Sequence, residues 1–227
     1  MNDKIQVYQQ LESYMLKYND LKRVAVQDCK EDLVELPRYL PFQTKQIDTR
    51  MIAYTGDKIY VRQTVSKMLF RASQLLIRIN PQYKLEIVYG YRALSIQQLL
   101  YKQIKQKLQK QYSGEQLIEA IHRYIAVPSV SGHPTGGAID IQIVMDENPI
   151  NFGTKIWQFT PKAYTYSPFI SNVGQANRLL LRSIMLSVGF APFDGEWWHF
   201  SFGDKEWAKY YNQPCAIYEQ IEFKKEV

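Results

Sequence analysis

The sequence contains little cysteine and no long hydrophobic run. Its two cysteines, Cys29 and Cys215, are too few for a disulfide framework or for a zinc site built from thiolates. Apolar stretches never reach the about 18 uninterrupted residues of a membrane-spanning helix, so we expect no membrane partner. The polar residues that follow Met1 leave no apolar core for a secretory signal. These absences favour a cytoplasmic protein, or a periplasmic one if the sequence is truncated.

A phosphate-binding glycine loop and an aromatic nucleic-acid motif are also missing. The 28 Lys and Arg residues exceed the 22 Asp and Glu residues, which gives a net charge of +6. The densest basic stretch, Lys102 to Lys110, is interleaved with glutamines, and such lysines spread round the solvated face of a helix. We therefore expect no nucleic-acid partner, while the composition leaves the oligomeric state open.

The residues that are present fit one globular domain. Of the 227 residues, 46% are hydrophobic and 22% are charged, which is enough for one sizeable core. No repeat or linker divides the chain, so we expect a single domain over 1–227 with an N-terminal helical extension over 1–23. Apolar residues at three- and four-residue steps predict helices over 4–19, 61–79, 95–112, 115–125 and 174–188.

Strands are expected mainly in the second half of the chain. Alternating apolar and polar residues predict strands over 83–89 and 138–144, and the aromatic segment 197–202 fits a third strand. Residues 145–172 have no periodicity and carry three prolines, and a loop of this length is often functional. The whole pattern predicts an α+β fold with a small, mostly antiparallel sheet flanked by helices.

Two of the three histidines lie in segments that suggest a metal site. His133 lies seven residues before Asp140, and His199 follows a double tryptophan. A catalytic zinc site needs about three protein ligands, for which imidazole and carboxylate are suitable donors. The Gly136-Gly137 pair permits a tight turn that brings Asp140 beside His133. Because Asp140 lies on an isoleucine-backed strand, its buried charge would be costly without a cation, so we consider a zinc site at the sheet.

Glu196 lies three residues before His199 and is a candidate for the base that takes a proton from the attacking water. Residues three apart on a regular strand face opposite sides, so Glu196 has to lie before the strand, where Asp194-Gly195 bends the chain. The alternative makes His133 a loop residue, His199 a packed strand histidine and Asp140 a satisfied turn carboxylate. The spacing alone leaves the two interpretations about even.

Four short segments keep the order and rough spacing of one family's motifs. SGHPTGGAID at 131–140 and EWWH at 196–199 resemble the two zinc signatures of the D-alanyl-D-alanine dipeptidases, S-x-H-x-x-G-x-A-x-D and E-W-W-H. YGYR at 89–92 resembles the D-G-Y-R of that family, and NRLLLRSIM at 177–185 resembles its pre-signature helix. The family includes the dipeptidase of vancomycin resistance, and the double tryptophan separates this branch from related carboxypeptidases.

The resemblance implies a role for each matching residue. His133, Asp140 and His199 become the ligands of one Zn²⁺ per chain. Glu196 becomes the general base, and later the acid that protonates the leaving amine. Arg92 becomes the residue that stabilises the developing oxyanion. Without the resemblance, Arg92 would be interpreted as an ordinary surface cation that follows a strand.

Further positions are candidates for substrate contact or for packing. Ser131 is a candidate polar contact to the substrate. Trp198 is a candidate wall of the substrate pocket, although it and Trp197 can equally build the core next to the metal. His122 stands beside Arg123 on a predicted helix and is expected at the surface.

The resemblance is weakest in the loop between the two signatures. There the family carries an acidic residue that helps to hold the ammonium group of the substrate. Aligning 152–154 with the similar M-G-S or M-G-T of the family puts Trp157 at or near that position. The family's histidine-containing stretch that follows is replaced here by Tyr-Thr-Tyr-Ser at 164–167. Because a buried ammonium without a carboxylate is costly, we expect the amino end to be bound differently, with Trp157 as a candidate contact.

These observations predict a compact zinc metallopeptidase that hydrolyses D-Ala-D-Ala or a closely related short D-amino-acid dipeptide, with the water activated by Glu196. Its partner would be a small peptide, in the recycling or limiting of cell-wall precursors. One alternative is a D,D-carboxypeptidase or other wall-peptide hydrolase on the same scaffold, favoured by the altered loop. Another is a zinc-binding interaction module without catalysis, against which Glu196 and Arg92 argue because neither is needed to hold a metal.

Overall fold

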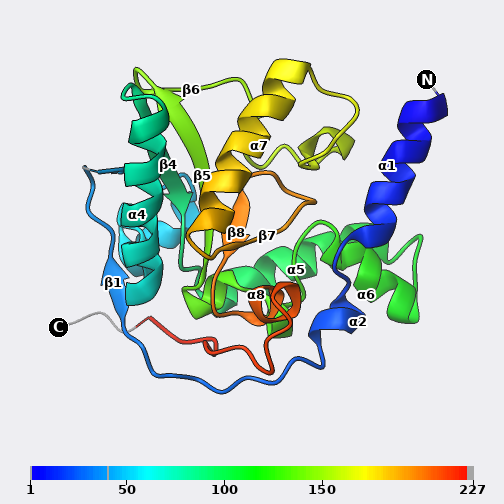
Figure 1. The fold of residues 1–227 in the computed structure, drawn as a ribbon. Coiled ribbons are helices and arrows are strands. Elements are labelled where there is room, and N and C mark those ends of the chain that lie inside the picture. The colour runs from blue at the N-terminus through cyan, green and yellow to red at the C-terminus, as the bar shows by residue number, and fades with distance from the viewer. Residues whose placement is uncertain (1, 40, 224–227) are drawn as a thin grey trace.

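The computed structural model describes residues 2–39 and 41–223, and these form one α+β domain (Figure 1). Residues 1, 40 and 224–227 of the expected 1–227 domain lie outside the described part of the chain. In Figure 1 the two long helices α4 (Gln63–Ile79) and α7 (Asn172–Ser187) lie in front of the main sheet. Helix α1 (Asn2–Tyr14) stands at the opposite side of the molecule from α4.

A six-stranded sheet runs through the described part of the domain. The strands of the chain are β1 Leu33–Glu35, β2 Gln43–Thr44, β3 Tyr60–Arg62, β4 Tyr83–Tyr89, β5 Ala138–Met145, β6 Asn148–Pro149, β7 Ala191–Pro192 and β8 His199–Ser201. The main sheet has the order β2-β4-β5-β8-β7, with β6 paired to β5, while β1 and β3 form a separate pair. Only β2 and β4 run parallel among these pairs, so the predicted mostly antiparallel sheet is confirmed.

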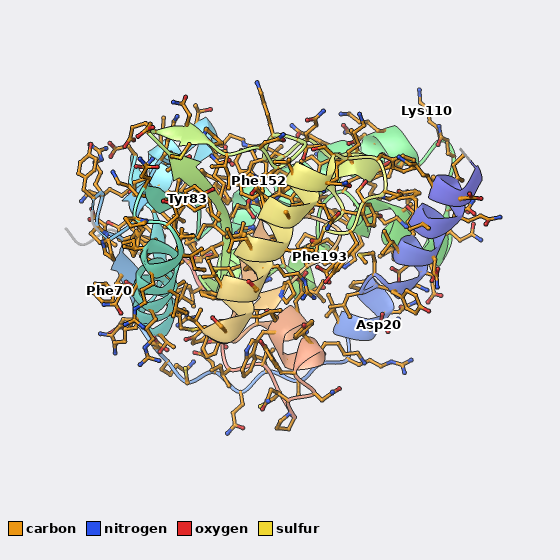
Figure 2. All side chains as sticks on the ribbon, turned by 45° about the horizontal axis from the view of Figure 1, so that its top comes forward. Asp20, Phe70, Tyr83, Lys110, Phe152 and Phe193 are labelled. Carbon is orange, nitrogen blue, oxygen red and sulfur yellow. The ribbon has the colours of Figure 1, made fainter. Side chains whose placement is uncertain are left out.

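The central strand β5 separates the hydrophobic core from the polar face of the sheet. Ile139, Ile141 and Ile143 are fully buried in the core cluster that α4 and α7 complete. Asp140 points to the opposite face, because successive side chains of a strand alternate. In Figure 2, Tyr83 and Phe152 lie beside α4 and α7, and both belong to this core. The strand therefore presents its carboxylate on a rigid, well-packed support.

The other described helices and turns complete the fold. They are α2 Tyr18–Leu21, η1 Thr49–Met51, α3 Ile52–Thr55, α5 Leu94–Leu108, α6 Gly114–His122, η2 Pro128–Val130, η3 His133–Thr135, η4 Pro161–Ala163 and α8 Lys205–Tyr210. Helices α4, α5, α6 and α7 form where the apolar periodicity predicts them, with α5 and α6 ending a few residues earlier than expected. None of the described helices combines the length and the apolar character needed to cross a membrane.

The N-terminal segment differs from the single helix expected over 4–19. Helix α1 ends at Tyr14 and a second helix, α2, begins at Tyr18. The reason is tertiary: the carboxylate of Glu119 on α6 accepts hydrogen bonds from the backbone N–H groups of Tyr18 and Asn19, at 3.0 Å each. The first N–H groups of a helix have no partner within the helix, and a carboxylate that accepts from them stabilises the start of α2.

The third predicted strand, 197–202, is shorter in the structure and covers His199–Ser201. The residues before it form a turn, in which the Glu196 N–H donates to the Phe193 carbonyl at 2.9 Å and the His199 N–H donates to the Glu196 carbonyl at 3.0 Å. Glu196 thus lies before the strand, in the bend that its expected role requires.

Candidate metal centre and its cavity

Three of the residues singled out by the sequence meet on the polar face of the sheet. Asp140 and His199 are direct cross-strand neighbours on β5 and β8. His133 lies on η3, and Gly136, at φ +75°, turns the chain from η3 into β5. The Oδ1 atom of Asp140 lies 3.6 Å from Nε2 of His133 and 3.2 Å from Nδ1 of His199. One ligand atom from each of the three residues lies within 4.8 Å of the others, so the group can hold a metal ion.

The hydrogen bonds behind both histidines leave the converging nitrogens free to bind a cation. Nδ1 of His133 lies 2.9 Å from the Gly90 carbonyl, which can only accept, so this nitrogen carries the proton. Nε2 of His199 lies 3.3 Å from a carboxylate oxygen of Glu206. When His199 is neutral and keeps its proton on Nε2 toward Glu206, the lone pairs of His133 Nε2 and His199 Nδ1 both face the Asp140 oxygen; without a cation, a protonated His199 Nδ1 donates to that oxygen at 3.2 Å instead. Since lone pairs and a carboxylate repel each other, the donor set fits a cation such as Zn²⁺.

The electrostatics of the three groups agree with that geometry. Burial by itself would raise the pKa of Asp140, but His133 and His199 outweigh it and hold the pKa well below its usual range. Burial and the nearby Arg92 lower the pKa of His133, which favours the neutral, metal-binding form. Burial acts to lower the pKa of His199, but Asp140 and Glu206 raise it well above its usual value when no cation is bound.

The second oxygen of Asp140 is held by the long loop between the signatures. Nε1 of Trp157 donates to Asp140 Oδ2 at 2.8 Å, and the indole packs edge-on against the ring of Tyr89 with centroids 5.4 Å apart. The buried Arg178 of α7 anchors this loop by donating to the carbonyls of Phe152 and Tyr164, at 2.8 and 2.6 Å. The predicted loop thus delivers Trp157 to the metal ligand rather than leaving its N–H free for a substrate.

Glu196 is carried by the turn before β8 and lines the same cavity. Helix α7 holds that turn, because Arg182 makes a two-pronged ion pair with Asp194 at 2.8 and 2.9 Å. Burial raises the pKa of the Glu196 carboxyl to about 8, although His199 acts to lower it. A carboxylate with a pKa near neutral is suited to take up a proton and to release it again.

Arg92 is buried and points into the cavity wall, unlike an ordinary surface cation after a strand. Its Nη1 donates to Gln97 Oε1 at 2.7 Å and its Nε donates to the Tyr89 hydroxyl at 3.1 Å. The Tyr89 hydroxyl in turn donates to Asp48 at 2.8 Å. These contacts fix the guanidinium in one place beside the metal centre.

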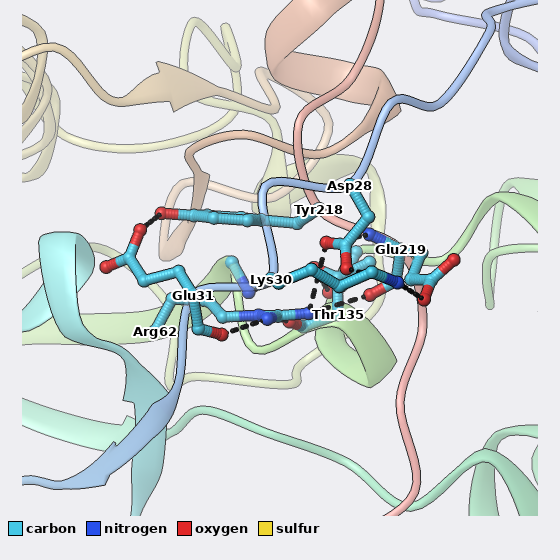
Figure 3. A network of polar contacts seen from close by, with 9 residues as sticks. Asp28, Lys30, Glu31, Arg62, Thr135, Tyr218 and Glu219 are labelled. Carbon is cyan, nitrogen blue, oxygen red and sulfur yellow. Dashed lines mark hydrogen bonds and ion pairs between the residues drawn. The ribbon is translucent and has the colours of Figure 1, made fainter.

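A second buried arginine, Arg62, supports the segment that carries His133 (Figure 3). Its Nε donates to the Thr135 carbonyl at 2.6 Å and its Nη2 donates to the Glu219 carbonyl at 3.0 Å. The guanidinium also stacks against the ring of Tyr218, 4.9 Å from the centroid. Arg62 therefore ties η3 to the C-terminal part of the described chain.

The metal centre opens into a cavity of about 60 Å³. Ser131 and Trp157, which the sequence offers as candidate substrate contacts, line this cavity. Trp198 does not lie in its wall: the side chain is fully buried in the core, 5.4 Å from Trp197 between ring centroids. Trp198 therefore builds the hydrophobic core next to the metal centre and is not a wall of the substrate pocket.

The expectation that His122 lies at the surface is wrong. The side chain is only 7% exposed and lines the metal cavity. The chain after α6 folds back over the ring, so that the Val127 N–H donates to His122 Nδ1 at 3.2 Å. The neighbouring Arg123 favours an exposed position for His122, and no local sequence pattern indicates that the chain returns over its ring.

A larger cavity of about 260 Å³ adjoins the metal cavity, and its walls include Tyr8 and Glu12 of α1. Glu196, Phe193 and His122 line both cavities, so the two share a wall. In Figure 2, Phe193 lies between α7 and α1. The N-terminal helix thus contributes a wall to the space next to the metal centre.

Several residues of the site were missed from the sequence. Tyr89, Gln97 and Glu206 stand next to Arg92 or His199 only in the folded chain. The signal for Tyr89 was its place directly before the Gly-Tyr-Arg segment at the end of β4. Glu206 lies seven residues after His199, on the first turn of α8, and no spacing rule links the two.

Among the solved structures that resemble this chain are two enzymes of low sequence identity. A mutant of a vancomycin-resistance D,D-pentapeptidase in complex with Zn(II) is 19% identical, with a TM-score of 0.41 over 85% of this chain and 94% of the other. An LD-carboxypeptidase described for peptidoglycan recognition is 19% identical, with a TM-score of 0.44 over 80% and 72%. The family assignment rests on the sequence comparisons instead.

The sequence comparisons agree with the motifs. The D-alanyl-D-alanine dipeptidase of Synechocystis sp. (strain ATCC 27184 / PCC 6803 / Kazusa) is 29% identical over 233 residues, which cover 88% of this chain and 93% of that protein. The family model of peptidase M15, described as D-ala-D-ala dipeptidase, matches residues 22–220. Because this match spans most of the sequence, the chain belongs to peptidase family M15 and is a metallopeptidase of the D-alanyl-D-alanine dipeptidase type.

Proposed function

We propose that the protein hydrolyses D-Ala-D-Ala, or a closely related short D-amino-acid dipeptide, with one zinc ion held by His133, Asp140 and His199. The observation that carries this proposal is the convergence of the two imidazole nitrogens on Oδ1 of Asp140, at 3.6 and 3.2 Å. Zinc in this place would polarise the scissile carbonyl and lower the pKa of a water molecule toward neutrality.

Glu196 moves the protons of the reaction. Its carboxylate accepts a proton from the attacking water and then gives that proton to the leaving amine. The burial that raises its pKa to about 8 supports both steps, because the protonated and ionised forms lie close in free energy near neutral pH.

Arg92 binds the oxygen on which negative charge develops. Gln97 and Tyr89 hold its guanidinium at 2.7 and 3.1 Å, so little reorganisation is needed when the charge forms. A preorganised donor in a closed cavity stabilises a transition state more than a mobile surface cation does. Ser131, in the same cavity wall, provides a further polar group toward the substrate.

A second candidate function is that of a D,D-carboxypeptidase acting on a longer wall peptide. The adjoining cavity of about 260 Å³ favours it, because Glu196 lines both that space and the metal cavity. Ligand pockets usually measure roughly 300–1,000 Å³, and the metal cavity of about 60 Å³ reaches that range only together with its neighbour.

The test is the release of D-alanine by purified, zinc-loaded protein. The panel contains D-Ala-D-Ala, its N-acetyl form and a longer peptide ending in D-Ala-D-Ala, with Glu196→Gln as the catalytic control and His199→Ala as the metal-binding control. Release from the free dipeptide supports the dipeptidase, and release from the longer peptide supports the carboxypeptidase. Zinc retained without any release would refute both and favour the interaction module.

We expect Glu196→Gln to keep zinc and to lose turnover by about 10²- to 10⁴-fold, the usual contribution of a general acid–base. His199→Ala should lose zinc, as measured by elemental analysis after dialysis. Full zinc content in His199→Ala would contradict the proposed ligand set, whatever the activity.

A further inference from the structure

Glu206 is a buried carboxylate in the wall of the metal cavity for which the proposed chemistry has no use. It lies on the first turn of α8, is 9% exposed, and lines the cavity together with Ser131 and His122. Its Oε2 atom lies 3.3 Å from Nε2 of His199, on the side of the imidazole ring away from Asp140. One of its two oxygens is therefore engaged with the proposed ligand histidine.

The other carboxylates of the cavity wall are already occupied. Asp140 uses Oδ1 toward the two histidines and Oδ2 for the indole of Trp157. Glu196 is assigned to proton transfer. In the part of the chain that the structure describes, Oε1 of Glu206 has no hydrogen-bond partner, and His199 is the one ion-pair partner of its carboxylate.

The charge of Glu206 needs a cation once His199 binds a metal. In that state His199 is neutral and offers Glu206 one N–H donor, without a positive charge. The other basic groups of the cavity wall are engaged elsewhere: Arg92 donates hydrogen bonds to Gln97 and Tyr89. His122 Nδ1 accepts a hydrogen bond from the Val127 N–H, so this nitrogen carries no proton and the ring is neutral. A buried carboxylate without a cation is costly.

We propose that Glu206 binds the α-ammonium group of the substrate and so makes the enzyme select peptides with an unblocked amino end. The inference rests on the proposed function, since it assumes that the substrate occupies this cavity. It assigns the two oxygens of one carboxylate to two tasks: Oε2 orients His199, and Oε1 recognises the substrate. The carboxylate that faces the ammonium thus comes from α8, after the second signature, and not from the loop that carries Trp157.

The test separates the charge of Glu206 from its hydrogen bond. Glu206→Gln keeps an oxygen that accepts from His199 Nε2 but removes the negative charge. Two substrates of nearly equal size are compared, D-Ala-D-Ala and D-lactoyl-D-alanine, in which a hydroxyl replaces the ammonium. Zinc-loaded wild type should cleave the first about 10- to 100-fold more efficiently in kcat/KM, the usual effect of one charged hydrogen bond.

In Glu206→Gln this preference should vanish, through a higher KM for D-Ala-D-Ala and little change for D-lactoyl-D-alanine. The zinc dissociation constant should stay within about threefold of the wild type, because the orienting hydrogen bond remains. Glu115→Gln, an exposed acid on α6, is the matched control and should keep the preference. Calorimetric binding of both peptides to zinc-loaded Glu196→Gln gives the same comparison without turnover and without altering Glu206.

Equal loss of both substrates in Glu206→Gln, together with weaker zinc binding, would assign Glu206 to positioning of His199 alone and overturn the inference. Equal affinity of the two peptides for zinc-loaded Glu196→Gln would overturn it even if Glu206→Gln did not fold. These outcomes differ from failure of the proposed function, in which wild type cleaves no D-alanine peptide. Cleavage of both peptides with equal efficiency would leave the dipeptidase standing and remove only the role of Glu206.

Discussion

The indole N–H of Trp157 donates a hydrogen bond of 2.8 Å to Oδ2 of Asp140, the oxygen that does not face the two histidines. Trp157 adopts φ +61°, a backbone conformation uncommon for a bulky residue, and Arg178 holds the surrounding loop in place. A loop position for which the sequence suggested a substrate contact is thus an orienting partner of a proposed metal ligand. Such outer partners set the direction and the basicity of the ligand.

Trp157→Phe should therefore weaken zinc binding by about tenfold, because the ring can still pack on Tyr89 while Asp140 loses its hydrogen bond. The measurement is a competition titration with a chromophoric chelator. Trp207→Phe, which alters a tryptophan packed between Phe202 and Tyr211, is the control and should bind zinc as the wild type does. An unchanged zinc affinity in Trp157→Phe would show that this hydrogen bond does not support the metal site.

Zinc affinity should rise with pH. Without a cation, burial acts to lower the pKa of His199, but Asp140 and Glu206 raise it well above its usual value, so the ring is protonated at neutral pH. Zinc must displace that proton, and each displaced proton strengthens apparent binding by up to about tenfold per pH unit below the pKa. Titrations at about pH 6, 7 and 8 measure the slope. A flat profile over that interval would contradict a protonated His199 in the absence of metal.

Arg92→Ala should lower kcat on D-Ala-D-Ala by on the order of 10²-fold or more, with a smaller change in KM, if the guanidinium acts on charge that forms in the transition state. Steady-state kinetics on the zinc-loaded enzyme measure both constants. Arg71→Ala, at an exposed position of α4, removes the same charge elsewhere and should leave kcat unchanged. Wild-type kcat in Arg92→Ala would return Arg92 to a packing role.

Arg62→Leu should lower the free energy of unfolding by about 3 kcal/mol, because it leaves the buried carbonyl of Thr135 without a donor and removes the link to the Glu219 carbonyl. Urea denaturation measures this difference. Arg78→Leu on the exposed face of α4 serves as the control and should change stability little. Equal stability of Arg62→Leu and wild type would mean that the contacts in Figure 3 do not hold η3 in place.

Elements with strong, local patterning can be predicted from the amino-acid sequence without the fold. Strand β4 covers the predicted residues 83–89, and β5 extends the predicted 138–144 by one residue, because their alternation reflects one buried and one polar face. The motif segments contain His133, Asp140 and His199, the three residues that meet at the candidate metal centre. The requirement that Glu196 precede the strand also followed from strand geometry alone, and the turn before β8 confirms it.

The hydrogen-bond partners of those residues follow from the folded chain and not from local patterning. Glu206 reaches His199 from α8, Gly90 reaches His133 from the end of β4, and Trp157 reaches Asp140 from a loop without periodicity. The break between α1 and α2 has the same origin, because Glu119 comes from a helix about a hundred residues away in sequence. Hydrophobic periodicity reports which face of an element is buried, whereas a hydrogen-bond partner depends on where the folded chain returns, and no local pattern encodes that return.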